Sequence, residues 1–448
     1  MASDLRIKGA PGRRAYLNAH LIDASCGLDG RGGILIDDGR IVGVGPQVTA
    51  AAAGSAATIV DCGGAILLPG LIDMRVITGE PGNEHRETLA SASHAAAAGG
   101  VTTMIVMPNT APVIDDAAIV DFILRRARDT AIVRVVPMAA ITKGLDGRQI
   151  TEIGLLQEAG AAAVTDGTHA VVDAAIMKRA LAYANDFGML VVQHVEEPTL
   201  ATGVMNSGEV ATRLGLPETP PAAEVIMLER DIRLVELTGA RYHAAQISCR
   251  ESLEVVRRAK ERGLPISCGV SVNHLVLNEN DIGAYRTFFK ISPPLRSEDD
   301  RLAMVEGVKD SSIDVIVSSH DPQNPDTKRL PFAEAEFGAI GLETMFSAVM
   351  RLHHDGSVPL PRLIEAMTSA PASVLGLETG RLQPGAPADL AIADLSQNWR
   401  VEADDLKSAS KNSPFEHTVL EGRIIETIVA GRSVYSLDRG RNSAKRTA

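Results

Sequence analysis

Residues 65–75 (AILLPGLIDMR), 89–100 (LASASHAAAAGG) and 102–107 (TTMIVM) decide the fold of this chain. The first and third runs are short and aliphatic, as strands are, and the middle run is Ala-rich and helical in character. It ends in Gly-Gly, which is typical of a helix C-terminus. A strand, a helix and a second strand in this order predict a βαβ unit with parallel strands.

The same alternation continues as far as Leu377, through six further apolar runs. Eight strand–helix units over residues 65–377 predict an α/β protein with a (β/α)8 TIM barrel. Short apolar runs broken by Gly and Asp precede and follow this region, and they are typical of antiparallel strands. We therefore expect residues 1–64 and 378–448 to form a small β-sandwich domain together, with a polar tail at the C-terminus. The six runs are VRVVPMAAIT, AAVTDG, MLVVQH, YHAAQIS, PISCGVS and IDVIVSSHD.

The composition limits the classes of partner. The net charge of −12 argues against nucleic acid and against a polybasic membrane contact. No apolar run reaches membrane-spanning length, so we expect a cytoplasmic protein. The cysteines show no CxxC spacing, which disfavours a zinc cluster or a disulfide framework and predicts reduced, buried thiols. They are Cys26, Cys62, Cys249 and Cys268.

Polar residues gather where the predicted strands end, which is where active sites lie in TIM barrels. A catalytic metal site needs several histidines and carboxylates around an open position. Each candidate alone could equally close a turn or fill a core position, but their shared location argues against that explanation for all of them. The first strand, in contrast, ends on Arg75 and Ile77. The candidate ligands are Asp166, His194, His274, His320 and Asp321.

Several motifs identify a family resemblance. They begin with PGLIDMRVITGEPG at 69–82 and HRETLASASHAAAAGGVTTMIVMPNTAPVIDD at 85–116, and continue in VTDG, VVQHVEE, YHAAQIS, VSVNHL, KISPPLR, IDVIVSSHDP and GRLQPGAPADL. From about Ala15 to Tyr435 the chain resembles type I dihydroorotases of the amidohydrolase superfamily. The resemblance implies a metal-dependent barrel that interconverts carbamoyl-aspartate and dihydroorotate in pyrimidine biosynthesis. Hydantoinases and allantoinases share this scaffold.

The chain departs from the family at the residues that matter for catalysis. The resemblance implies metal ligands at six positions, of which Asp166 and His194 are kept. The other four are Arg75, Ile77, Gln246 and Ser319, and the family's aspartate at the last position is also the general base. Of four substrate anchors only Asn109 is kept, since the other three positions hold Gly79, Ser292 and Gln323.

These losses are chemically severe. Isoleucine cannot coordinate a cation, glutamine is a poor zinc ligand, and serine cannot replace the carboxylate base. Arg75 carries a permanent positive charge. At about 4 Å and an effective dielectric of 20 it would repel a dication by roughly 8 kcal/mol. We expect Arg75 to pair with Asp166 instead.

Three functions remain open from the sequence. The chain is a non-catalytic homologue without a metal cofactor, which acts as a structural partner of aspartate transcarbamoylase, as inactive dihydroorotase-like chains do in some bacteria. Alternatively, it is an active cyclic amidohydrolase with one zinc held by Asp166, His194 and either His274 or His320. The third possibility is a metal-free activity or a sensor in which Arg75, Asn109 and Asn273 hold an anion. The resemblance also implies a homo-oligomer.

Overall fold

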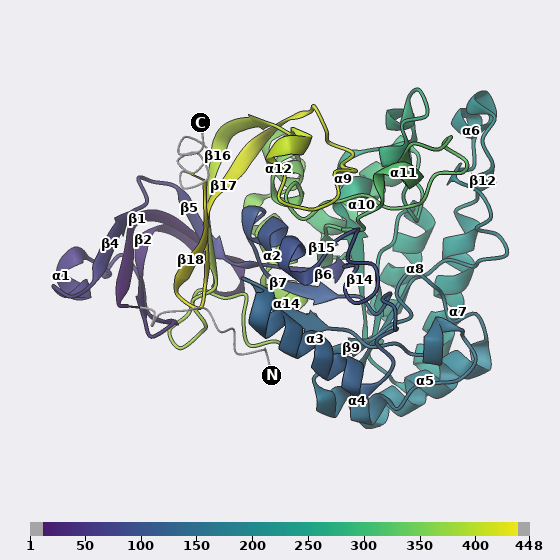
Figure 1. Ribbon diagram of the computed structural model, residues 1–448, viewed down its shortest axis with the longest axis horizontal. Coiled ribbons are helices and arrows are strands. Elements are labelled where there is room, and N and C mark those ends of the chain that lie inside the picture. Colours follow the sequence, from purple (N-terminus) through teal and green to yellow (C-terminus); the bar gives the residue numbers. More distant parts are fainter. Residues whose placement is uncertain (1–11, 438–448) are drawn as a thin grey trace.

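The computed structural model describes residues 12–437, and Figure 1 shows a small β-rich part beside a larger part in which helices surround strands. The polar tail predicted at the C-terminus begins within residues 438–448 and lies outside the described residues. Within 12–437, no helix combines the length and apolarity needed to cross a membrane.

The small part is one hydrogen-bonded sheet made from both ends of the chain. Its order is β18-β17-β16-β5-β1-β2-β3, with β4 paired to β1. β5 pairs antiparallel with β16, so the two ends are joined directly, and the sheet includes residues beyond the boundary at 64 that the sequence predicted. The strands are β1 (Arg14–Asp23), β2 (Leu28–Asp37), β3 (Arg40–Gly45), β4 (Thr58–Asp61), β5 (Ile66–Pro69), β16 (Leu390–Arg400), β17 (Val419–Val429) and β18 (Arg432–Ser436).

The larger part contains parallel strands in two hydrogen-bonded groups, β6-β7-β8 and β9-β10-β13-β14-β15. Isolated parallel bridges connect the groups at both ends, between Ala139 and Val164 and between Val76 and His320. The run AILLPGLIDMR divides at Gly70 between β5 and β6, so only its second half belongs here. The strands are β6 (Leu71–Val76), β7 (Val101–Val106), β8 (Arg134–Pro137), β9 (Ala163–Val164), β10 (Leu190–Gln193), β13 (Tyr242–Ala244), β14 (Ile266–Ser271) and β15 (Val315–Val317).

Helices follow these strands and bury aliphatic faces against them, as the low aromatic content requires. Thr88, Asp116 and Asp173 begin three of them by accepting backbone N–H bonds at the N-cap. The helices are α2 (Leu89–Ala98), α3 (Ala117–Thr130), α4 (Ile153–Ala159), α5 (Ala174–Asp186), α7 (Ala222–Thr238), α8 (Arg250–Glu261), α9 (Val272–Val276), α10 (Glu298–Lys309), α12 (Met345–His354), α13 (Leu360–Met367) and α14 (Ser369–Leu375). Shorter elements are α1 (Ala50–Ala53), α6 (Glu209–Leu214), α11 (Pro325–Lys328), β11 (Met205–Asn206) and β12 (Glu218–Thr219).

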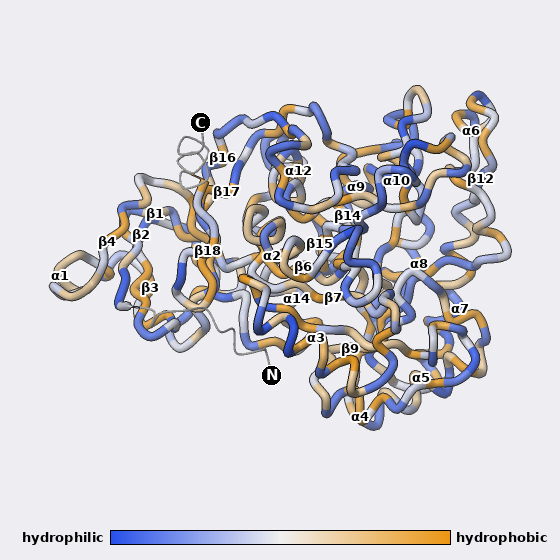
Figure 2. The backbone as a smooth tube through the Cα atoms, in the orientation of Figure 1, coloured by the Kyte–Doolittle hydropathy of each residue, from blue (hydrophilic) through white to orange (hydrophobic). Residues whose placement is uncertain are grey.

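The segment 401–418 joins β16 to β17 and lies against the loops that follow β6 and β15. Figure 2 shows it as largely hydrophilic, in contrast to β6 and β7. The Ser408 hydroxyl donates a hydrogen bond to the buried Glu87 carboxylate, and Asn412 Nδ2 donates one to the Asp321 carbonyl at 3.3 Å. The small part thereby contacts one side of the region where the candidate site lies.

All four cysteines are free, as the sequence predicts. Cys249 and Cys268 are buried, but Cys26 is exposed and Cys62 is half-buried. The prediction of burial is wrong for these two. Cys26 ends a short turn (Ala24–Cys26) between β1 and β2, and Cys62 follows β4 and packs only partly against the core of the sheet.

Candidate functional site

Asp166 follows β9 and is held by Thr142, which follows β8. The carboxylate, only 1% exposed, accepts hydrogen bonds from the Thr142 backbone N–H at 2.9 Å and from the Thr142 hydroxyl. Burial raises the pKa of Asp166 to about 6, although both bonds oppose that rise. The ion pair expected between Asp166 and Arg75 is not formed among the described residues. Thr142 was not predicted, because a threonine that ends an apolar run carries no distinctive signal.

Arg75 lies on β6 with a guanidinium that is almost fully enclosed. Burial lowers its pKa, while the negative charges of Asp321, Asp73 and Glu196 act in the opposite direction. Its Nη1 atom is buried without a hydrogen-bond partner, and within residues 12–437 no carboxylate is close enough to form an ion pair with it. The charge of Arg75 is therefore balanced by several carboxylates at a distance, and not by one ion-pair partner.

Asp321 and Asp73 are the two carboxylates whose charges act most strongly on Arg75. Both accept hydrogen bonds from groups other than its guanidinium. Asp73 Oδ1 accepts the backbone N–H groups of Arg75 at 3.1 Å and Ser318 at 3.2 Å. Asp321 accepts a 2.7 Å hydrogen bond from the side-chain amide of Gln323, one of the lost substrate anchors. Burial raises the pKa of both Asp73 and Asp321 to about 6. Below that pH these groups would take up protons.

His194, Glu196 and Ser292 form a hydrogen-bonded cluster after β10. His194 Nε2 lies 3.0 Å from Glu196 Oε2, and the Ser292 hydroxyl donates to the same oxygen at 2.8 Å. Burial would raise the pKa of Glu196, but the hydrogen bonds from His194 and Ser292 bring it below its usual value. Because an ionised carboxylate only accepts, we assign the ring proton to Nε2. The other ring nitrogen, Nδ1, is buried without a hydrogen-bond partner.

Gln246, Ile77 and Ser319 stand at the other three positions where the resemblance implies metal ligands. Gln246 donates a 2.7 Å hydrogen bond from Nε2 to the Ser292 carbonyl, which leaves its Oε1 unpartnered. Ile77 packs beside an apolar cluster under the strand ends. Ser319 has φ of +53°, a left-handed conformation that residues other than glycine rarely adopt. The resemblance implies the catalytic carboxylate at this position, so the residue that replaces it has a strained backbone.

Each of the two alternative histidine ligands uses one ring nitrogen in a backbone contact and keeps the other without a hydrogen-bond partner, Nδ1 in His274 and Nε2 in His320. His274 Nε2 lies 3.1 Å from the Pro293 carbonyl, and burial lowers the pKa of this ring to about 4. His320 Nδ1 accepts the Gly341 backbone N–H at 3.3 Å. Asn273, next to His274 on α9, is buried with Oδ1 unpartnered.

Asn109, the one substrate anchor that the resemblance implies is kept, lies directly against Gly167. Its Nδ2 donates to Thr168 at 3.2 Å, and its buried Oδ1 has no partner. A Cβ atom on Gly167 would lie 1.8 Å from that oxygen, so only glycine fits. At Gly79, where the family has an arginine, a Cβ atom would lie 1.9 Å from the Asn83 carbonyl. The backbone turn itself thus excludes a side chain at this anchor position.

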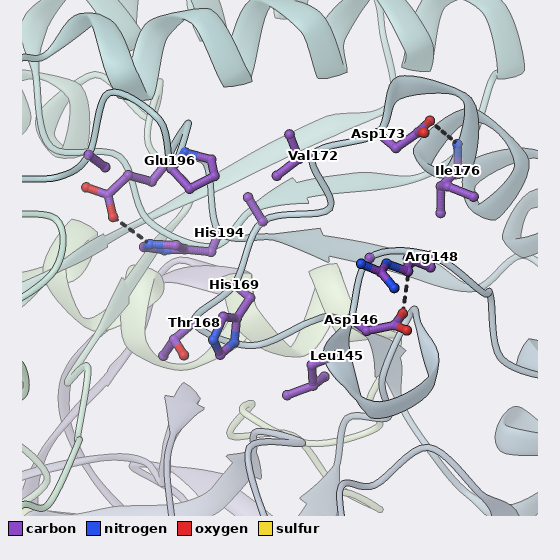
Figure 3. A pocket seen from close by; sticks show the side chains of 14 residues that line it. Leu145, Asp146, Arg148, Thr168, His169, Val172, Asp173, Ile176, His194 and Glu196 are labelled. Atoms are coloured by element: carbon purple, nitrogen blue, oxygen red, sulfur yellow. Dashed lines mark hydrogen bonds and ion pairs between the residues drawn. The ribbon is translucent and has the colours of Figure 1, made fainter.

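A cavity of about 780 Å³ opens between the loops that follow β8, β9 and β10, and we call it the side cavity. Figure 3 shows His194, His169 and Arg148 around one space, with Glu196 beyond His194. Sequence reasoning placed only His194 here, because the others lie in loops that carry no strand or helix pattern. The cavity is lined by Leu145, Asp146, Gly147, Arg148, Thr168, His169, Ala170, Val172, Asp173, Ile176, His194, Glu196, Pro198 and Ala201.

Comparison with known proteins places the chain in a family. A family model described as dihydro-orotase-like matches residues 64–252, and an amidohydrolase family model matches 330–435. A dihydroorotase from Citrifermentans bemidjiense is 42% identical over 93% of this chain and 97% of that protein. One from Anaplasma phagocytophilum is 39% identical over 94% of this chain and 95% of that protein. This chain belongs to the dihydroorotase family. The resemblance inferred from the motifs is thereby confirmed.

Solved structures show the same fold for this dihydroorotase homologue at lower identity. L-hydantoinase from Arthrobacter aurescens superposes with a TM-score of 0.87 at 24% identity, and the match covers 95% of this chain and 96% of that one. Dihydropyrimidinase from Brevibacillus agri gives 0.80 at 20% identity over 95% of each chain. At these identities the likeness concerns the fold alone.

The zinc site expected of a dihydroorotase does not fit the residues of this chain. Within residues 12–437 no group of three or more His, Cys, Asp or Glu side chains is arranged to hold a metal ion. A zinc site normally requires three or four such ligands. Asp166 and His194, at the two positions where the resemblance implies that a ligand is kept, are bonded to Thr142 and Glu196. Arg75 adds a buried positive charge to the same region.

Proposed function

We propose that this dihydroorotase-like protein of pyrimidine biosynthesis does not catalyse the metal-dependent reaction and acts as a structural partner of aspartate transcarbamoylase. We also propose that its strands β6 to β15 close into a (β/α)8 barrel, beside a β domain made by both ends of the chain. The isolated bridges between Val76 and His320 and between Ala139 and Val164 support this closure.

The observation that carries the proposal is the buried Arg75 guanidinium. It has a partnerless Nη1 among the carboxylates of Asp73, Asp321 and Glu196, where the family has a histidine ligand. A divalent cation would meet a fixed charge of the same sign there. In addition, Ser319 cannot accept a proton as the family's aspartate does. Losing one of these groups would slow an enzyme, whereas the combined loss removes both the metal and the base.

Support for a structural role comes from what the chain has kept. The match to dihydroorotases extends over more than nine-tenths of the chain, and most of the buried apolar side chains form one large cluster. A scaffold that retains its fold without its chemistry suits a role in assembly. The resemblance suggests aspartate transcarbamoylase as the partner, and association of this chain with itself as a further element of the assembly.

Two measurements on the same purified sample test the proposal. Elemental analysis should find less than one zinc per chain, and dihydroorotate hydrolysis should be undetectable, even after zinc is supplied. Co-expression with the aspartate transcarbamoylase of the same organism should yield a complex on size-exclusion chromatography. Stoichiometric zinc with turnover that a chelator abolishes would instead establish the alternative, an active cyclic amidohydrolase with an atypical zinc site. Separate elution of the two proteins would refute the structural role.

A further inference from the structure

Three large apolar side chains are exposed on neighbouring helices of the larger part. Leu155 on α4 is 56% exposed, Phe187 at the C-terminus of α5 is 43% exposed, and Leu237 in the last turn of α7 is 70% exposed. Phe187 and Leu237 precede β10 and β13, so they lie at the end of the parallel strands opposite the candidate site. Figure 1 shows α4, α5 and α7 in a row along one border of the larger part.

Contacts between the helix ends join these positions into one surface. A Cβ atom on Gly154 would lie 2.7 Å from the Phe187 ring, so this ring rests on the first turn of α4. The Asn185 side-chain amide donates at 3.3 Å to the carbonyl of Thr238, the residue after Leu237. Apolar side chains that are exposed singly need no explanation, whereas a joined group of them is typical of an interaction surface.

The charged side chains around this group differ in sign between its two sides. Glu158 on α4 and Asp186 on α5 are exposed carboxylates, and neither forms an ion pair within residues 12–437. On the side of α7, the guanidinium groups of Arg233 and Arg262 share the single carboxylate of Glu236. This trio therefore carries a net positive charge, while the side of α4 and α5 is negative.

We propose that this surface is the contact between two copies of the chain related by a two-fold axis. We call it the end surface, and its central residues are Leu155, Glu158, Asp186, Phe187, Arg233 and Leu237. A two-fold axis sets the surface against itself, so the negative side of one copy faces the positive side of the other. The apolar side chains of both copies then leave water together. This inference rests on the proposed structural role, because it names the surface through which the chain associates with itself.

Sedimentation velocity of the full chain from about 1 to 100 µM tests the contact. Wild type should form a dimer with a Kd of about 10 µM or tighter. Leu237→Asp and Phe187→Asp should each weaken it at least about tenfold, because each places a charge in the apolar group. Leu302→Asp is the matched control, since Leu302 is 48% exposed on α10 and should leave the dimer unchanged. Equal melting temperatures of the variants and wild type establish that the fold is kept.

Two results of this experiment would overturn the proposal. One is a wild-type chain that remains monomeric at the highest concentration. The other is an oligomer that both Leu237→Asp and Phe187→Asp leave as stable as in wild type, because its contact then lies elsewhere.

Charge reversal tests the two-fold arrangement itself. Glu158→Arg and Arg233→Glu should each weaken self-association about fivefold, because each reduces the opposition of charge across the axis. An equimolar mixture of the two variants should dimerise as tightly as wild type. In that mixed dimer the reversed side of one variant faces the reversed side of the other, and the two unchanged sides also face each other. A mixture that associates no more tightly than the single variants would refute the two-fold contact.

The proposed partner and the proposed loss of metal are tested separately on the same samples. A chain that is monomeric alone but loses its complex with aspartate transcarbamoylase in Leu237→Asp would assign the end surface to that protein and refute the second copy. Stoichiometric zinc with turnover in a wild-type dimer would contradict the proposed function and leave the dimer contact standing. The two failures are therefore distinguishable.

Discussion

Replacing Thr142 with valine should destabilise the protein by about 1–2 kcal/mol at pH 8. The substitution keeps the shape of the side chain and removes the hydroxyl that donates to Asp166, a carboxylate only 1% exposed. A hydrogen bond to a charged group contributes about 1.5–3 kcal/mol. The added methyl group returns roughly 0.8 kcal/mol through apolar burial. The backbone N–H of Thr142 still donates at 2.9 Å, so the carboxylate keeps one donor.

The loss of unfolding free energy caused by Thr142→Val should become smaller as the pH falls. Burial raises the folded-state pKa of Asp166 to about 6, above an unfolded value of roughly 3.9. The folded protein therefore binds the proton more tightly, and this carboxyl costs stability above pH 6, a cost that disappears as the pH falls through 6 towards 4. Removing the hydroxyl destabilises the ionised form most, so the loss caused by Thr142→Val should shrink between pH 8 and pH 5. A smaller part of the loss is the same at both pH values, because the hydroxyl also accepts a 3.0 Å hydrogen bond from the Gly147 N–H.

Urea denaturation of wild type and variant at pH 8 and pH 5 measures this effect. Thr130→Val is the control, because that hydroxyl donates to a backbone carbonyl on the exposed end of α3 and no carboxylate is involved. Its effect should be the same at both pH values. An equal loss for Thr142→Val at both pH values, or a loss below about 0.5 kcal/mol at pH 8, would refute the assignment of Thr142 as the group that holds Asp166.

Two further predictions concern neighbouring parts of the site. Gly167→Ala should lower the melting temperature more than Gly147→Ala does. The two glycines have φ of +70° and +72°, but only at Gly167 would the new Cβ meet Asn109, whereas Gly147 has nothing within 4 Å. Equal shifts would show that Asn109 moves aside freely. Arg75→His should not bind zinc, because three other ligand positions remain lost, and elemental analysis that found one zinc per chain would contradict this.

The sequence predicts the order of elements because strands and helices follow local patterns. Aliphatic runs of strand length mark the parallel strands of the larger part. β10 lies within the run that predicts it, and β6 and β7 each extend one residue beyond theirs. Polar residues at the ends of those runs indicate where a site would lie. The division of the first run between two sheets is not visible in the pattern, since Gly70 interrupts neither its hydropathy nor its length.

The pairing of the site residues is beyond the reach of the sequence. The sequence predicts an ion pair between Arg75 and Asp166. In the structure Asp166 instead accepts hydrogen bonds from Thr142, and the Arg75 guanidinium lies among the charges of several carboxylates. The segment 401–418 reads as a polar loop, yet it is bonded to buried groups after β6 and β15. Such contacts join residues from distant parts of the chain.

The sequence by itself therefore determined which chemical groups this protein contains, and which groups implied by the family resemblance it lacks. At positions where the resemblance implies metal ligands, isoleucine cannot coordinate a cation, glutamine is a poor zinc ligand and serine cannot replace a carboxylate base, whatever the surrounding fold. Only the tertiary structure decided which nitrogen of His194 is free and which carboxylates face a cavity, because hydrogen bonds and desolvation depend on separations of a few ångströms between strands. Packing fixes those separations, and no pattern along the chain records them.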